Sequence, residues 1–160
     1  MQKVTPFLWF DDQAEEAAAF YLAVFDDARK VSNVVDDARQ VSLDGRPGKA
    51  SGITIEVGGQ RLFLFNGGPY FKLNEAFSLF IDCGTQAEVD YYWERLTADG
   101  GQESQCGWLK DKFGVSWQVV PEVLTRGLSD PDPEVAKRVA ASMMTMTKLD
   151  VAELERAYAG

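Results

Sequence analysis

The chain has 160 residues, 46% apolar and 26% charged, so it is long enough to fold as one ordinary globular domain with a sizeable core. It contains no histidine, which excludes Ser-His-Asp triads, Cys-His dyads, two-histidine iron sites and the common histidine-bearing zinc sites. With 16 basic and 25 acidic residues its net charge is −9, so its surface repels phosphate backbones and anionic lipids. We therefore expect neither nucleic acid nor a membrane among its partners.

The N-terminal apolar run is short and ends at Asp11 and Asp12, and no stretch approaches the roughly 18 to 20 apolar residues that span a bilayer. A cytoplasmic protein without an export signal is expected. In that compartment Cys83 and Cys106 are expected to be free thiols.

A short apolar strand over residues 7–10 opens the first half of the chain, and a helix follows it. Asp12 is expected to cap this helix, with Glu15 completing a capping box. The helix carries an apolar stripe at helical spacing: Ala14, Ala17, Ala18, Tyr21, Leu22 and Phe25. Three strands are then predicted: residues 29–35, 52–57 and 61–66. Gly58 and Gly59 predict a two-residue hairpin turn between the last two.

Both alternating faces are apolar in the predicted strand that contains Leu62, Phe63, Leu64 and Phe65. A sheet with one wet face would alternate apolar and polar residues there. The helix of the same module is expected to cover one face. The other must be covered by a second sheet, a partner chain or an apolar ligand.

The same order recurs from Ser78 onward, with Gln86 in the place of Gln13. Thr85 and Glu88 predict a capping box at the start of the second helix. That helix carries a second apolar stripe: Val89, Tyr92, Trp93 and Leu96. It is expected to end at Asp99-Gly100-Gly101. Three strands are predicted after it: residues 101–105, 107–110 and 115–120.

From Pro121 the pattern becomes helical. Asp132 and Pro133 predict one helix start, and Asp150 with Glu153 predicts another. The first of these helices carries an apolar stripe: Val135, Ala136, Val139, Ala140, Met143 and Met144. Methionines at this spacing are expected to form core or dimer contacts rather than a promiscuous binding face.

Two consecutive modules of strand, helix and three strands resemble the vicinal oxygen chelate superfamily, which includes glyoxalase I, extradiol dioxygenases and bleomycin-resistance proteins. Four segments resemble its PhnB-like branch in particular: Asp11–Ala17 with Phe20-Tyr21, Asn66–Pro69, Gln86–Asp90 with Trp93, and Cys106–Gly114 through Trp117–Pro121. The resemblance implies an α+β fold in which two βαβββ modules form a glyoxalase-like half-barrel sheet. It implies a domain over residues 1–120, with modules about 3–68 and 74–120, and a C-terminal helical extension over 121–160.

The resemblance implies that metal-binding members of that superfamily have histidines at the positions of Thr5 and Ala76 and a glutamate at the position of Gln118. Asn66 is the remaining polar oxygen near the expected fourth ligand. Hard cations are bound mainly by carboxylates, so this neutral set predicts no tightly held metal and no cofactor.

The branch is often labelled with a 3-demethylubiquinone 3-methyltransferase name. An S-adenosylmethionine enzyme of the usual kind has a glycine-rich turn between a strand and a helix. The pairs Gly58-Gly59 and Gly67-Gly68 do not precede a predicted helix. The sequence therefore does not predict methyl transfer.

Cys106, Trp108 and Lys110 alternate along one predicted strand, and Gln118 lies on the strand that returns from the turn. On a ligand-facing surface, Trp108 would stack on a planar ligand and Lys110 and Gln118 would orient its polar groups. Cys106 would be a nucleophile if the lysine lowered its pKa. Alternatively Trp108 is core, Lys110 extends to solvent or pairs with an acidic neighbour, and Cys106 is a small buried hydrophobe.

Asn66, followed by Gly67-Gly68-Pro69, would hold a ligand oxygen at a pocket mouth, or would simply form a tight connection between the modules. Phe7 and Trp9 share a strand face, where they would line a cavity or belong to the core. Paired carboxylates such as Asp36-Asp37 are interpreted as solvated charges.

The favoured hypothesis is a homodimeric protein that binds a small apolar or aromatic molecule without a tightly held metal. The alternative is an enzyme of the same fold with a nonstandard metal site or with chemistry at Cys106 or Lys110. A third hypothesis is a structural dimer without a ligand.

Overall fold

The computed structural model describes residues 2–34 and 52–160, and the structural statements below concern those residues. It divides into two compact units, Met1–Leu73 and Asn74–Gly160. The first corresponds to the first predicted module. The second unit holds the second module together with the predicted C-terminal extension. Each unit is described by itself.

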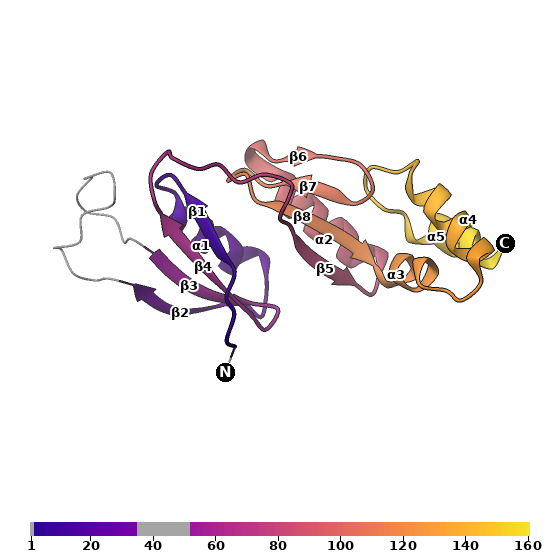
Figure 1. Ribbon diagram of the computed structural model, residues 1–160, viewed down its shortest axis with the longest axis horizontal. Helices are drawn as coiled ribbons and strands as arrows, with labels where there is room; N and C mark the ends of the chain where they lie inside the picture. The colour runs from indigo at the N-terminus through magenta and orange to yellow at the C-terminus, as the bar shows by residue number, and fades with distance from the viewer. Residues whose placement is uncertain (1, 35–51) are drawn as a thin grey trace. The chain divides into compact units, whose positions relative to one another are not determined.

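The first unit is a four-stranded mixed sheet with the order β1-β4-β3-β2 and one helix (Figure 1). Its elements are β1 (Phe7–Phe10), α1 (Ala14–Val24), β2 (Arg29–Val34), β3 (Gly52–Val57) and β4 (Gln60–Asn66). Strand β1 is parallel to β4, while β3 is antiparallel to both of its neighbours. The predicted strands are confirmed, except that residue 35 lies outside the described residues.

Helix α1 packs on one face of this sheet and buries most of its predicted stripe. The largest fully buried side chains of the unit include Tyr21 from the helix and Leu8, Ile55, Leu62 and Leu64 from the strands. Alternate strand residues point to opposite faces of the sheet, so these strand side chains all face α1. Burial of this apolar surface between the helix and the sheet holds the two together.

The N-cap position of α1 lies one residue after the predicted Asp12. The N-cap residue is Gln13, and it makes no side-chain cap bond. Instead the Asn66 side-chain oxygen, at the end of β4, accepts a hydrogen bond of 2.8 Å from the backbone N–H of Ala14. The first turn of α1 is therefore capped from a strand distant in sequence.

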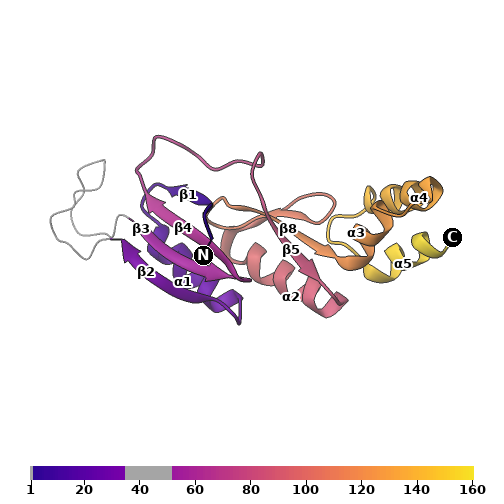
Figure 2. The ribbon, with the colours of Figure 1, turned by 60° about the horizontal axis from the view of Figure 1, so that its bottom comes forward.

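The second unit repeats the arrangement, with a four-stranded sheet of order β5-β8-β7-β6 (Figure 1). Figure 2 shows strands β5 and β8 of this sheet from a second direction. Its elements are β5 (Leu79–Cys83), α2 (Gln86–Thr97), the 3-10 turn η1 (Ala98–Gly100), β6 (Gln102–Glu103), β7 (Trp108–Lys110) and β8 (Ser116–Pro121). Strand β8 is parallel to β5 and antiparallel to β7. Two predicted strands are shorter than expected, because β6 covers only two residues and β7 begins at Trp108 rather than at Gly107.

The capping box predicted at the start of α2 is confirmed. The Thr85 hydroxyl accepts from the backbone N–H of Glu88, and the Glu88 carboxylate accepts from the backbone N–H of Thr85 at 3.1 Å. The first turn of α2 is therefore capped by side chains at its own N-terminus, whereas the first turn of α1 is capped by a side chain from β4.

The hairpin between β7 and β8 is built around a buried carboxylate, Asp111, which is 3% exposed. One of its oxygens accepts from the backbone N–H groups of Phe113 and Val115 at 2.9 and 3.0 Å. The other accepts from the indole N–H of Trp117 at 2.9 Å. The tight turn predicted from Asp111 to Gly114 thus has a side chain that organises it.

Three helices form the C-terminal extension: α3 (Glu122–Leu128), α4 (Pro133–Met143) and α5 (Val151–Ala159). Asp132 and Asp150 cap α4 and α5 as predicted, accepting from the N–H groups of Glu134 and Glu153. Their core is a cluster of six buried residues: Val120, Val123, Leu124, Val139, Leu149 and Leu154. The predicted methionine stripe is only partly confirmed, because Met143 packs against this cluster while Met144 is 66% exposed.

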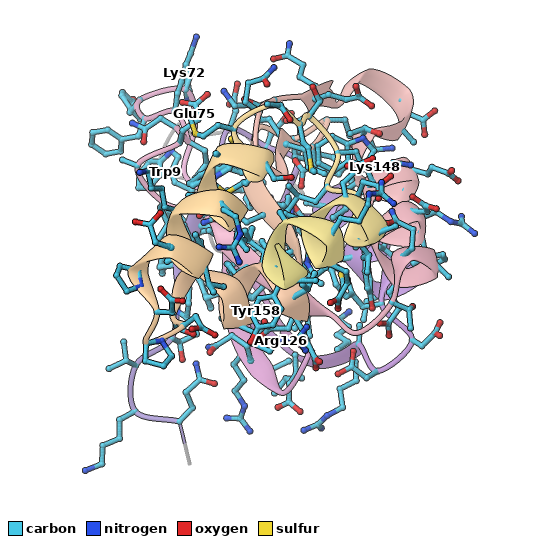
Figure 3. The ribbon with its side chains drawn as sticks, turned by 90° about the vertical axis from the view of Figure 1, so that its right-hand side faces the viewer. Trp9, Lys72, Glu75, Arg126, Lys148 and Tyr158 are labelled. Carbon is cyan, nitrogen blue, oxygen red and sulfur yellow. The ribbon has the colours of Figure 1, made fainter. Side chains whose placement is uncertain are left out.

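Arg126 and Tyr158 lie together on the outside of these helices, as Figure 3 shows. The Arg126 guanidinium carbon is 4.8 Å from the centre of the Tyr158 ring, and the Tyr158 hydroxyl donates to Asp130 at 3.0 Å. These contacts join α3 to α5.

The loop between α4 and α5 is hydrogen-bonded to the second module. The backbone N–H groups of Cys106 and Gly107 donate to the carbonyls of Met146 and Thr147, each at 2.8 Å. The Gln86 side chain accepts from the backbone N–H of Val151 at 2.8 Å. The extension is therefore attached to both the start of α2 and the loop before β7. None of the described helices is long and apolar enough to cross a membrane.

Candidate functional site

The face of the first sheet opposite α1 carries an aromatic cluster, which we call the aromatic face: Phe7, Trp9, Phe63 and Phe65. The Phe7 ring stacks on Phe63 with centroids 4.9 Å apart, and Trp9 meets Phe65 edge to face at 5.2 Å. Phe7 is 56% exposed, and the other three are half-buried. The predicted sharing of one face by Phe7 and Trp9 is confirmed, and both faces of β4 are apolar as expected.

Trp9 is fixed against the segment that follows β4. Its indole N–H donates to the carbonyl of Gly68 at 2.9 Å. A Cβ atom on Gly67 would come within 2.2 Å of the Trp9 ring, so only glycine fits there. Asn66 is 2% exposed, and its side-chain oxygen caps α1. These contacts support the interpretation of this segment as a tight connection rather than as a ligand clamp.

The face of the second sheet opposite α2 has a different composition. Gln118 on β8 is the register partner of Trp108 on β7 and of Phe80 on β5. Three adjacent strands therefore present an amide between two aromatic side chains. Gln118 thus lies on the strand that returns from the turn, as predicted, and directly opposite Trp108. Its side-chain nitrogen donates to the Ser78 hydroxyl at 2.9 Å, which fixes the amide.

A pocket of about 450 Å³ lies on this face, and we call it the sheet pocket. The sheet contributes Phe80, Trp108 and Gln118, and Cys106 borders it. The C-terminal helices contribute Leu124, Leu128 and Met143. Sequence reasoning missed these last three residues, because it assigned Met143 to core or dimer contacts and gave Leu124 and Leu128 no role.

A second pocket of about 510 Å³ lies beside it, and we call it the edge pocket. It is bordered by Glu75, Glu103, Cys106, Trp108, Lys110 and Ser116. The Lys110 ammonium lies 2.5 Å from the Glu75 carboxylate. The hydrogen bond from Lys110 is the main reason why the pKa of Glu75 lies below its usual value. Lys110 is thus paired with an acidic neighbour, one of the predicted outcomes.

Cys106 does not alternate with Trp108 along a strand, which corrects the prediction. Its backbone has φ of 59°, in the left-handed region, in the loop before β7. It nevertheless borders both pockets, and its sulfur lies 3.8 Å from that of Met144. Cys83 is fully buried, and burial raises the pKa of its thiol to about 12. Both cysteines are free.

The donor groups do not fit a resident divalent metal. Among residues 2–34 and 52–160, no group of three or more His, Cys, Asp or Glu side chains is placed to hold one. Gln118 and Asn66 offer neutral amides that are already hydrogen-bonded within their own units. Neutral oxygens without a carboxylate hold hard cations weakly.

Neither glycine pair forms the glycine-rich turn between a strand and a helix that S-adenosylmethionine enzymes of the usual kind have. Gly58 and Gly59 connect β3 to β4, with φ of 56° and 73°, as the two-residue hairpin predicted from the sequence. Gly67 and Gly68 follow β4, and the next element is the strand β5.

Comparisons with known proteins agree on one family. A family model described as 3-demethylubiquinone-9 3-methyltransferase matches residues 2–120. The structure of a putative 3-demethylubiquinone-9 3-methyltransferase, PhnB protein, from Bacillus cereus has a TM-score of 0.66 at 32% identity, over 75% of this chain and 99% of that one. No curated protein matches the chain.

More distant structures share the fold. Protein PA1353 from Pseudomonas aeruginosa has a TM-score of 0.61 at 19% identity, covering 76% of this chain and 98% of its own. The fosfomycin resistance protein FosX from Mesorhizobium loti has a TM-score of 0.53 at 16% identity, covering 73% and 90%. Residues 121–160, which contribute half of the sheet pocket, lie outside the family match.

Proposed function

From the membership of this chain in the PhnB-like family, the 3-demethylubiquinone-9 3-methyltransferase family of the vicinal oxygen chelate superfamily, we propose that it binds a small apolar or aromatic molecule without a tightly held metal. The methyltransferase description is the name of the family model and assigns no reaction to this chain. The binding site in this proposal is the sheet pocket.

The observation that carries the proposal is the composition of this pocket. Aromatic side chains from two strands, Phe80 and Trp108, flank the Gln118 amide. Apolar side chains of the extension complete the wall. Small-molecule sites are typically concave, mostly apolar and about 300–1,000 Å³ in volume, with a few polar groups that fix orientation. A pocket of about 450 Å³ with this lining fits that description.

Trp108 is the side chain on which we expect a ring to stack. It is half-buried, so one part of the indole is held by the sheet while another part borders the pocket. Offset stacking on an indole adds about 0.5–1.5 kcal/mol to the burial of apolar area. Gln118 would orient a polar substituent of the ligand.

Fluorescence titration with N-phenyl-1-naphthylamine tests the proposal, because this neutral probe brightens in apolar surroundings. We expect saturable binding that weakens about tenfold or more in Trp108→Ala, from the loss of the stacking surface. Phe77→Ala is the matched control, since Phe77 is an aromatic residue of the same unit, 49% exposed, that borders neither pocket. Equal weakening in both variants, or no saturable binding, would contradict the proposal.

The metal-free part is tested separately. Protein treated with EDTA should bind the probe as untreated protein does. Probe binding that disappears with EDTA and returns with added Mn²⁺ would overturn this part while leaving the pocket assigned.

The homodimer expected from the sequence stays a prediction. Sedimentation velocity at micromolar concentration tests it, since a dimer has twice the mass of one chain.

A further inference from the structure

Ser116, on the central strand β8, is a buried polar residue that borders the edge pocket. It is 2% exposed, and its hydroxyl has no hydrogen-bond partner among the described residues. Most buried side-chain polar atoms in proteins have such a partner, and leaving one without it costs about 1–3 kcal/mol. A buried hydroxyl that borders a pocket is therefore a candidate contact for a ligand.

The sheet register places this hydroxyl among the other residues of the pocket. Lys110 is the register partner of Ser116, and Trp108 is the partner of Gln118, two residues further along β8. Residues two apart on a strand share a face, so Ser116 and Trp108 are diagonal neighbours on the face opposite α2. Trp108 and Cys106 border both pockets. A ring on Trp108 thus lies next to the buried hydroxyl.

The charges of the edge pocket favour a neutral group at Ser116. The Lys110 ammonium is engaged by Glu75 at 2.5 Å. The second carboxylate of the pocket, Glu103, accepts from the indole N–H of Trp93 at 2.7 Å. One ammonium against two carboxylates provides no excess positive charge for an anion.

We propose that the ligand is a planar aromatic molecule that carries a neutral hydroxyl or carbonyl group, and that Ser116 in the edge pocket hydrogen-bonds this group while Trp108 stacks on the ring. This inference rests on the proposed function, extends its site from the sheet pocket across Trp108 into the edge pocket, and names the class of the ligand. The side-chain hydroxyl of serine both donates and accepts, so it serves either substituent.

The test compares 2-naphthol with 2-methylnaphthalene, which has a methyl group in place of the hydroxyl. At pH 7 both are neutral, and isothermal titration calorimetry measures each with the wild-type protein and with Ser116→Ala. We expect the wild type to prefer 2-naphthol about tenfold, and Ser116→Ala to lose this preference while binding 2-methylnaphthalene unchanged. Equal wild-type affinities, or a preference that persists in the variant, would overturn the inference and leave the proposed function standing. Failure of both compounds to bind would count against the proposed function itself.

A stability measurement separates ligand contact from a structural role. If the hydroxyl has no partner in the free protein, Ser116→Ala does not lower the melting temperature. Ser78→Ala is the matched comparison, because the Ser78 hydroxyl accepts from Gln118 and its removal should lower the melting temperature. A clear fall for Ser116→Ala, as large as that for Ser78→Ala, would show a structural partner and contradict the inference.

Discussion

The two modules repeat one order of elements, but the sheet faces that their helices leave uncovered are different. In the first module that face is a cluster of aromatic rings around Phe65. In the second, the corresponding face mixes Trp108 with polar side chains, among them Gln118 and Ser116. The helix-facing rows are apolar in both. Packing against a helix thus requires an apolar face in both modules. The opposite face is free of this requirement, so polar side chains occur on it in the second module and aromatic rings in the first.

The local supports of the two modules differ as well. The first hairpin turns on Gly58 and Gly59, whose positive φ angles need no side chain. The second turns over the Asp111 carboxylate, which binds three N–H groups. Substitutions at equivalent turns of the two modules should therefore change the free energy of unfolding by different amounts.

The largest expected effect is a difference in thiol reactivity between the two cysteines of the second unit, Cys83 and Cys106. Burial raises the pKa of Cys83 to about 12, so at pH 8 almost none of it is thiolate. We expect it to react with a thiol reagent at least about a thousandfold more slowly than a cysteine of ordinary pKa. One fast thiol per chain should be counted, and it should disappear in Cys106→Ala. Two fast thiols in the native protein would be inconsistent with this burial.

Replacing the carboxylate of the second hairpin should destabilise the protein more than changing the first. Asp111→Ala leaves three N–H groups without their acceptor, and we expect the free energy of unfolding in urea to fall by about 3 kcal/mol. Gly58→Ala places a side chain at positive φ and should cost about 1 kcal/mol. Equal losses would show that the two hairpins depend on their turns to the same extent.

The two helix caps offer a smaller contrast. Asn66→Ala removes the acceptor of a buried N–H at the start of α1, so we expect a loss of about 2 kcal/mol. Thr85→Ala breaks an exposed capping box at the start of α2, for which about 1 kcal/mol is typical. Urea unfolding of both variants measures the difference. A larger loss for Thr85→Ala would mean that Asn66 contributes little as a cap.

The smallest effect is expected at the surface of the first sheet. A hydrogen bond from Arg29 is the main cause that lowers the pKa of Glu56 below 4.5. The stabilisation from this carboxylate is therefore complete above about pH 4.5 and is lost as the pH falls through the lowered pKa. Arg29→Met should be less stable than the wild type at pH 7, with a difference that narrows by pH 3. A difference independent of pH would assign the effect to packing instead.

Most of the fold could be predicted from the sequence, because apolar periodicity and turn residues are local signals. The Thr85–Glu88 box is an example, since its two side chains lie within one turn of a helix. The cap of α1 could not be predicted in the same way. The N-cap residue is Gln13 rather than Asp12, and the N–H of Ala14 is bonded by Asn66, brought there by the parallel pairing of β1 with β4.

The candidate site was predictable only in part, for a related reason. Strand alternation and the Asp111 turn were enough to place Gln118 on the strand beside that of Trp108, but not to show that the two residues lie directly opposite each other. Cys106 was predicted to share a face with Trp108, but its backbone is left-handed and its N–H bonds the loop between α4 and α5, a contact distant in sequence that no local pattern shows. Ser116 had no distinguishing signal among its apolar neighbours, because an unpartnered hydroxyl is recognised only once its surroundings are known.

The C-terminal extension, whose α4–α5 loop is attached to Cys106 and Gly107, has a consequence for ligand choice. Half of the lining of the sheet pocket comes from residues outside the family match. Under the proposed function, substitutions confined to pocket-lining side chains of the extension, such as Leu128, would change which ligand is bound while both sheets stay intact.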